Sequence, residues 1–498
     1  MNKEQKRRTL ANIPDGLAVT GRILDWLKDE TETRLPASCT TFSVEDSMEG
    51  ENGIEDSWIF TSHGLRYAAG VAVDLSKLRP SGSDNGRGLV ASGVVSFAKF
   101  YSLLNQELRR GGTYKNGAIT LFLDYDHPDC AEFINMPSAE LPWAKKAVYV
   151  DSGIKSHPIK NTLARAVNNG TVWLAKKMWD ENGNRLYSNV CLEVLLPHRG
   201  TCMLSSVNLG AVKEVEDLPN IFARSMDWLC VLHGQTNIDN GGYYLSPVED
   251  KQVGLGVIGL SNLLARKKVT YKQFEYALCD LLDNCSIEDE EYFRYVPVMA
   301  YKIAHFIIEG YKEAAKVARL YGMKRAFSVA PTASMSYRHK DVDGYTVSPE
   351  ISAPIAHEID RDSETFGVET YYYHPDSELA KNVGWSVQWK LLNTWQKLQD
   401  STGLGHAMSS NIWSSKRVTP EFIDEFVDSS LVTTYYRISV DQEALDKSEV
   451  VTPNSSEEKL RGMYEENEGD DLWFGDNDDA VFFSTPDHDD QYCNSCGG

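Results

Sequence analysis

Hydrophobic residues along the chain fall into short runs of strand length and into longer stretches with helical spacing. Residues 71–78 and 118–125 are apolar runs of strand length. Between them, residues 92–110 carry apolar side chains at helical spacing and end at Gly111 and Gly112, which is typical of a helix terminus. A strand, a helix and a second strand in this order predict a parallel crossover unit.

The same mixture of patterns continues along the chain. Residues 188–196 and 433–440 are predicted to be extended, and residues 298–320, just after Pro297, are predicted to form a long helix. The pattern therefore indicates the α/β class. Residues 254–259 fit the GxGxxG dinucleotide fingerprint, but no convincing strand precedes them and no clear βαβ unit follows. We interpret this segment as structural.

Length and composition predict a large packed protein. The chain has 498 residues, of which 42% are hydrophobic, so two domains or one large barrel are expected. The net charge of −22 argues against nucleic acid as a partner, because such binding neutralises phosphates with basic residues. The N-terminus lacks the apolar stretch of a signal peptide, and no apolar run is long enough to span a bilayer. We expect a soluble, cytoplasmic protein without a membrane partner.

The C-terminal segment differs from the rest of the chain. Residues 451–498 hold thirteen acidic and two basic side chains and have no sustained periodicity, which predicts a mobile acidic tail. Cys493 and Cys496 form a CxxC pair within it. A zinc site would need two further ligands nearby, so we predict no metal site and favour thiol–disulfide exchange. A flexible linker of about 50 residues reaches roughly 40 Å.

A polar triplet interrupts the apolar segment 188–196. If this segment is a strand, Asn189, Cys191 and Glu193 share one face, and burying them is costly unless they contact other polar groups. The simpler alternative is a strand at the rim of a sheet with an ordinary buried cysteine. A functional interpretation needs partners, and Cys39 and Cys202 are the candidates.

Taken together, these motifs resemble those of ribonucleotide reductase catalytic subunits. The matching elements are Ser38-Cys39, Asn189-x-Cys191-x-Glu193, the run 202–209 and the terminal dithiol, with further matches at 68–83, 109–124, 253–260 and 330–336. The resemblance covers about residues 34–437. It implies a ten-stranded α/β barrel with a catalytic finger loop over residues 39–440. It also implies a short helical segment without an ATP-cone at 1–38 and a flexible acidic tail at 441–498, as in minimal, virus-encoded forms acting in a host cytoplasm.

The resemblance also implies a radical mechanism. A thiyl radical on Cys191 would remove the 3′-hydrogen of the ribose, Glu193 would act as general base, and Asn189 would hold the sugar. Cys39 and Cys202 would supply two electrons and close to a disulfide.

Partners follow from the same resemblance. The tail dithiol of Cys493 and Cys496 would reduce the internal disulfide and would itself be reduced by thioredoxin or glutaredoxin. Tyr435 and Tyr436 resemble the tyrosine pair through which class I enzymes receive a radical from a separate, metal-containing small (β) subunit. Two alternatives stay open, namely an adenosylcobalamin-dependent (class II) reductase and a non-catalytic nucleotide-binding or redox module.

Two nucleotide sites are implied as well. The ribonucleoside diphosphate substrate would contact Ser38, Gly70 and the hydroxyl-rich residues Thr332, Ala333, Ser334, Met335 and Ser336, although a segment of this kind is also an ordinary helix cap. A dNTP or ATP effector with Mg²⁺ would bind a specificity site containing Asp46, Ser47 and Arg79. Arg66 would reach it from the other subunit of a homodimer. For these charged residues, solvated surface is the alternative. Residues 109–116 would relay the identity of the effector, with Lys115 where an arginine is usual.

Overall fold

The computed structural model describes residues 1–29, 34–84, 86, 88–108, 117–282, 296–363, 367–412 and 418–434. Several predictions lie outside these residues. They concern the relay loop 109–116, the tyrosines Tyr435 and Tyr436, and the tail cysteines Cys493 and Cys496.

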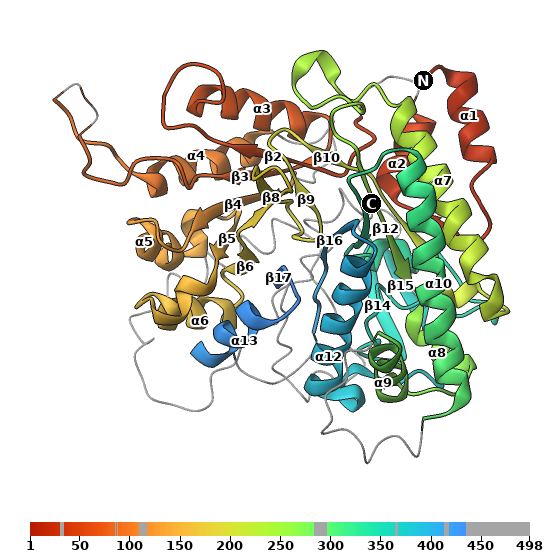
Figure 1. The fold of residues 1–498 in the computed structure, drawn as a ribbon. Helices are drawn as coiled ribbons and strands as arrows, with labels where there is room; N and C mark the ends of the chain where they lie inside the picture. Colours follow the sequence, from red (N-terminus) through yellow and green to blue (C-terminus); the bar gives the residue numbers. More distant parts are fainter. Residues whose placement is uncertain are drawn as a thin grey trace.

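One sheet is built mainly from the first half of the chain (Figure 1). Its seven strands follow the order β10-β2-β3-β4-β5-β6-β17, in which β2 to β6 are parallel and the two edge strands are antiparallel. Their bounds are β10 (Thr201–Cys202), β2 (Cys39–Ser43), β3 (Gly70–Asp74), β4 (Ile119–Asp124), β5 (Lys145–Val150), β6 (Trp173–Lys176) and β17 (Thr433–Thr434).

The second sheet comes mainly from the later part of the chain. It has the order β1-β11-β12-β13-β16, and its last four strands are parallel while β1 is antiparallel. The bounds are β1 (Leu17–Val19), β11 (Leu204–Asn208), β12 (Gln252–Ile258), β13 (Arg325–Val329) and β16 (Gly405–Met408).

The two sheets meet along two lines. Only Met203 separates β10 of the first sheet from β11 of the second, and its carbonyl accepts a 2.9 Å hydrogen bond from Gly254 N in β12. At the other end, Thr433 Oγ1 in β17 lies 3.3 Å from Met408 O in β16. The result is a curled, mostly parallel sheet, so the prediction of a mixed α/β fold of barrel type is confirmed.

Helices pack against these sheets. The parallel strands β3 and β4 are joined through α4, which confirms the predicted crossover unit, and the long predicted helix is α10 with the expected bounds. Figure 1 shows α7 beside α10, and the two helices are in contact. The helices are α1 (Lys3–Ala11), α2 (Gly21–Lys28), α3 (Ile54–Arg66), α4 (Val94–Glu107), α5 (Cys130–Asn135), α6 (Lys160–Asn168), α7 (Leu218–Gln235), α8 (Leu260–Arg266), α9 (Tyr271–Leu281), α10 (Val298–Leu320), α11 (Ala333–Tyr337), α12 (Ala380–Ser401) and α13 (Pro420–Asp428).

The GxGxxG segment lies in β12 and at its end, which agrees with its structural interpretation. A Cβ atom at Gly254 would lie 2.4 Å from a Leu204 methyl group, and one at Gly256 would lie 2.4 Å from Ser328 O. Both glycines therefore let neighbouring strands approach closely. Gly259 has a φ of +77° at the start of α8, a conformation that favours glycine.

The N-terminal segment contains α1 and α2, and it also contributes β1 to the second sheet. Among the described helices, none is long and apolar enough to cross a membrane.

Candidate active site

The segment that carries Asn189, Cys191 and Glu193 is a loop, so the prediction of a continuous strand is wrong at this point. Strands β8 (Arg185–Ser188) and β9 (Leu195–Leu196) pair antiparallel, and the chain turns between them. Leu192 has a φ of +70°, which a strand does not allow, and its N–H donates to Asn189 O at 3.2 Å. We call residues 189–194 the finger loop.

Asn189 and Glu193 were expected to share one face of a strand, but instead their side chains contact each other across the loop. Asn189 Nδ2 donates to Glu193 Oε1 at 2.8 Å, and Asn189 Oδ1 accepts the N–H of Val194 at 3.1 Å. Asn189 and Glu193 are both fully buried. The amide thus closes the loop and holds the carboxylate, which explains why the alternation of a flat strand fails here.

Strands of both sheets hold the base of the finger loop. The N–H of Ser188 donates to Tyr149 Oη in β5 at 2.9 Å. The N–H of Leu195 donates to His406 Nδ1 in β16 at 3.2 Å, and the other ring nitrogen, Nε2, lies 3.0 Å from Val253 O. Burial lowers the pKa of His406 to about 3, so the ring is neutral and Nε2 carries the proton. The finger loop therefore lies between the two sheets.

Cys39 and Cys202 are direct partners in the antiparallel pairing of β2 and β10. Cα atoms in such pairs are about 4.5–5.5 Å apart, which lies within the range of disulfides. The hydrogen bond with Cys39, burial, and the charges of Cys39 and Glu193 raise the pKa of Cys202 well above its ordinary value. Cys202 therefore remains a thiol at neutral pH and can give up hydrogen and electrons.

Cys191 belongs to the same buried cluster as these two cysteines. It is 1% exposed, and Phe122, Tyr149 and other side chains of the first sheet complete the cluster. The three thiols with predicted redox roles are thus gathered where the finger loop enters the barrel.

Ser38 and Gly70 lie beside the cysteine pair. Ser38 N donates to Cys202 O at 3.0 Å, Ser38 O accepts from Gly70 N at 2.8 Å, and Gly70 pairs with Cys39 across β2 and β3. Ser38 Oγ is buried and finds no hydrogen-bond partner within the described ranges. Such a hydroxyl can bind a polar ligand atom.

The predicted phosphate segment begins α11, and the structure adds a residue that sequence reasoning missed. The N–H of Thr332 donates to Glu350 Oε1 at 3.1 Å, and Thr332 Oγ1 accepts from Glu350 N at 2.9 Å. Ser336 Oγ donates to Ala333 O at 2.7 Å, and Met335 is buried. Thr332 and Ser336 are thus engaged within the protein, whereas Ala333 and Ser334 are partly exposed.

The residues predicted for an effector site fall into two places. Arg79 Nε donates to Asp46 Oδ2 at 2.8 Å, and Ser47 lies in the same turn, where its carbonyl accepts from Ile54 N. Arg66 ends α3, whose 13 residues span roughly 20 Å from Ile54. Within one subunit, Asp46, Ser47 and Arg79 therefore lie together, whereas Arg66 lies at the far end of α3.

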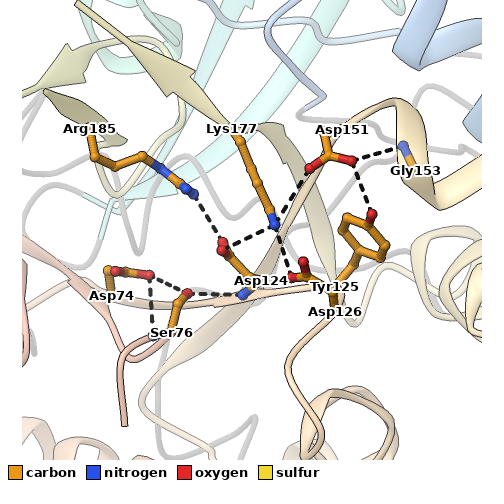
Figure 2. A network of polar contacts seen from close by, with 9 residues as sticks. All are labelled: Asp74, Ser76, Asp124, Tyr125, Asp126, Asp151, Gly153, Lys177 and Arg185. Carbon is orange, nitrogen blue, oxygen red and sulfur yellow. Dashed lines mark hydrogen bonds and ion pairs between the residues drawn. The ribbon is translucent and has the colours of Figure 1, made fainter. Parts of the chain in front are cut away.

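A charged network lies at the ends of β3, β4 and β5 (Figure 2). Lys177 Nζ lies 3.2 Å from Asp124, 2.9 Å from Asp126 and 3.5 Å from Asp151. Arg185 donates to Asp124 at 2.9 Å. Two cations thus face three carboxylates, and no metal-binding group of three or more His, Cys, Asp or Glu residues occurs in the described part of the chain.

Arg185 connects this network to the site. It begins β8, which leads into the finger loop, and its guanidinium lies 4.8 Å from the ring centroid of Tyr149. Asp74 completes the network by accepting from Ser76 Oγ at 2.6 Å, and burial raises the pKa of Asp74 to about 6. Tyr149, His406 and Glu350 were not selected from the sequence. Each is a polar residue in or beside an apolar run, and the sequence offers no stronger indication of a role.

Comparison with known proteins identifies the domain. Residues 37–173, from β2 to the start of β6, match the family model "Ribonucleotide reductase, barrel domain". Residues 37–173 are thus similar to the barrel domain of ribonucleotide reductases. A solved structure has a similar fold over a longer range: the class Id ribonucleotide reductase alpha subunit of Actinobacillus ureae has a TM-score of 0.58 at 16% identity, covering 90% of this chain and 94% of that one.

Curated proteins with similar sequences are named as vitamin B12-dependent reductases, not as class I enzymes. A vitamin B12-dependent ribonucleotide reductase of Agrobacterium fabrum is 32% identical over 108 residues, which is 22% of this chain and 8% of the relative. A vitamin B12-dependent ribonucleoside-diphosphate reductase of Mycobacterium tuberculosis is 26% identical over 300 residues, 49% of this chain and 41% of the relative. The chain thus spans less than half the length of these relatives.

Proposed function

We propose that this chain is the catalytic subunit of a ribonucleotide reductase that converts ribonucleoside diphosphates to 2′-deoxyribonucleoside diphosphates through a thiyl radical on Cys191. One observation carries the proposal, namely the buried cluster that joins Cys191 to the adjacent thiols of Cys39 and Cys202 next to the Asn189–Glu193 pair. The name of the Mycobacterium tuberculosis relative supports a diphosphate substrate.

The first half of the reaction uses the finger loop. The Cys191 thiol loses a hydrogen atom to the radical source, and the resulting thiyl radical removes the 3′-hydrogen of the ribose. Glu193 accepts the proton of the 3′-hydroxyl, which favours departure of the 2′-hydroxyl as water. Asn189, bonded to Glu193 at 2.8 Å, keeps this carboxylate in place beside the sugar.

The second half uses the cysteine pair. Cys39 and Cys202 together supply two electrons and two hydrogens, one of which protonates the leaving hydroxyl while the other is delivered to C2′. Their sulfurs then form a disulfide. Cys191 returns a hydrogen atom to C3′ and regains its radical, and Glu193 returns its proton to the 3′-oxygen. The balance is one ribonucleotide and two thiols giving one deoxyribonucleotide, one disulfide and water.

Nucleotides occupy two sites in this proposal. The substrate contacts Ser38 and Gly70 near the cysteine pair and places its phosphates at the segment Thr332, Ala333, Ser334, Met335 and Ser336. The specificity site uses Asp46, Ser47 and Arg79 for a dNTP or ATP with Mg²⁺. The Asp46–Arg79 contact of 2.8 Å supports a shared site for these two residues.

A homodimer would complete the effector site with Arg66 of the second subunit. Apolar side chains are exposed on α3 and α4, where Ile59 is 55% and Leu103 is 52% exposed, and Trp58 stacks on Phe100 with ring centroids 4.1 Å apart. An exposed apolar surface on two adjacent helices is typical of an interface. This surface includes the helix that ends at Arg66, which supports a contribution of Arg66 across the dimer.

The radical source separates two candidate forms. The adjacent tyrosines Tyr435 and Tyr436 favour a class I enzyme with a metal-containing small subunit. The names of the curated relatives favour the adenosylcobalamin-dependent form. We favour class I because a tyrosine pair at this position has a direct use in radical transfer from a partner subunit.

One assay tests both the proposed reaction at Cys191 and the proposed source of the radical. The purified chain is supplied with CDP, an effector and a dithiol, and receives either adenosylcobalamin or a candidate small subunit. We expect dCDP only with the small subunit, loss of product in Cys191→Ser, and loss in Tyr435→Phe and Tyr436→Phe. Product with adenosylcobalamin alone would assign the class II form, whereas turnover by Cys191→Ser would contradict the proposed reaction.

A further inference from the structure

Three side-chain hydroxyls hold the backbone of the finger loop. They donate to three of its carbonyl groups, one before Cys191 and two after it. The bonds are Thr120 Oγ1 to Val190 O at 2.9 Å, Thr433 Oγ1 to Leu192 O at 2.8 Å, and Ser328 Oγ to Glu193 O at 2.8 Å. We call Thr120, Ser328 and Thr433 the hydroxyl clamp.

The clamp comes from three separate parts of the barrel. Thr120 lies in β4, Ser328 in β13 and Thr433 in β17, at sequence separations of 70, 135 and 241 residues from the carbonyls they bind. Each clamp residue is at most 1% exposed. A buried Ser or Thr commonly bonds a carbonyl of its own neighbourhood. Three hydroxyls that come from distant parts of the chain and bind one loop therefore do more than satisfy their own hydrogen-bonding groups.

The backbone conformation of Leu192 explains why the finger loop needs the hydroxyl clamp. A leucine with a φ of +70° is strained, and such a conformation persists only when its surroundings enforce it. Thr433 binds the carbonyl of this residue, which directly follows Cys191. This buried bond therefore stabilises the strained residue directly, and the other two bonds hold the carbonyls of Val190 and Glu193 on either side.

We propose that Thr120, Ser328 and Thr433 are positioning residues that fix the Cys191 thiol relative to the sugar. The inference rests on the proposed function, in which Cys191 reacts. A misplacement of about 1 Å at a reacting atom can reduce turnover about 100-fold. Thr433 has a second role in the clamp because it stands two residues before Tyr435 in the sequence, so it ties the finger loop to the segment that leads to the tyrosine pair.

The decisive variants remove one hydroxyl each. Thr433→Val and Ser328→Ala lose the donor, whereas Thr433→Ser retains it. Thr236→Val is the matched control, because Thr236 is also buried and donates to a carbonyl, His233 O at 2.8 Å, at the end of α7. We expect kcat to fall 10- to 100-fold in the first two variants, with the KM for CDP changed less than threefold, and near-normal kcat in Thr433→Ser and Thr236→Val.

Hydrogen exchange provides a readout that does not depend on turnover. The amides of Asn189 and Leu192 bond within the loop, so a peptide that covers residues 187–196 should exchange faster in Thr433→Val and Ser328→Ala than in the other variants. Normal exchange and normal kcat in both variants would overturn the clamp. Faster exchange in a protein whose wild type reduces no ribonucleotide would support the clamp and contradict the proposed function. Ser328→Ala keeps the test valid if Thr433→Val does not fold.

Discussion

Cys39 and Cys202 face each other across a single antiparallel strand pair, and their side chains are hydrogen-bonded. Residues in such register can form a disulfide without movement of the backbone. The two strands belong to the same sheet, while the chain after Cys202 enters the second sheet as β11. The redox pair therefore lies at the line where the two halves of the barrel meet.

Among the described cysteines, mild oxidation should link this pair. We expect diamide, added to the substrate-free protein, to join the peptides that contain Cys39 and Cys202, because these two cysteines are direct partners in the pairing of β2 and β10. Peptide mass spectrometry under non-reducing conditions measures the linkage. Cys202→Ser is the control, and a disulfide that instead joins Cys191 to either residue would contradict the assigned roles.

Replacement of Glu193 by glutamine should separate catalysis from folding. The glutamine oxygen can still accept from Asn189, but the side chain no longer accepts a proton. We expect kcat to fall about 10²- to 10⁴-fold while the midpoint of thermal unfolding changes little. Steady-state kinetics and calorimetry measure the two quantities.

The matched control for this substitution is Glu275→Gln, a change at a buried carboxylate in α9. Equal losses of activity in Glu193→Gln and Glu275→Gln would indicate that replacing any buried carboxylate with an amide lowers activity. The role of Glu193 as base would then be untenable.

The tail dithiol should matter only for some reductants. In a variant with Cys493→Ser and Cys496→Ser, we expect a single turnover with thioredoxin as reductant but continued turnover with a small dithiol, which can reach the internal disulfide directly. Product per enzyme in a rapid-quench assay checks this. Equal rates with both reductants would mean that the tail is no shuttle.

Asp250 should give the protein a measurable pH dependence of stability. It accepts the N–H of Thr201, next to Cys202, at 2.7 Å, and burial raises the pKa of Asp250 from 3.8 to about 7. Between these pH values the folded state binds more protons than the unfolded state, so this group's contribution to stability is lost as the pH rises through 7.

Asp250→Asn removes that titration. The difference in free energy of unfolding, variant minus wild type, should therefore increase from pH 5 to pH 8, by on the order of 2 kcal/mol. Any lost hydrogen bond shifts the whole curve without changing its slope. Thermal midpoints across this pH range supply the measurement, and parallel curves would show that Asp250 is ionised throughout.

Local elements were predictable from the sequence where one pattern dominates. The helix at 298–320 and the strands around 71–74 and 119–124 follow directly from apolar periodicity. The cysteines of the candidate site were selected through the resemblance of their motifs to those of a known family, because the apolar run alone also fits an ordinary buried cysteine. The α/β class followed from the order of these elements.

The geometry of the finger loop could not be predicted in this way. Its turn depends on the Asn189 side chain and on bonds such as that from Thr433, 241 residues away from Leu192. Local patterns carry no information on such distant contacts. Glu350 was missed for the same reason, because its bond to Thr332 joins residues from different segments.

Gly256 shows how far such dependence extends. Its missing side chain lets β12 approach Ser328, and a methyl group there would lie 2.4 Å from the Ser328 carbonyl. Because the Ser328 hydroxyl donates to the Glu193 carbonyl, a single added carbon at Gly256 would displace the support of the proposed general base. We therefore expect variation at this glycine to be constrained by the proposed chemistry as much as by packing.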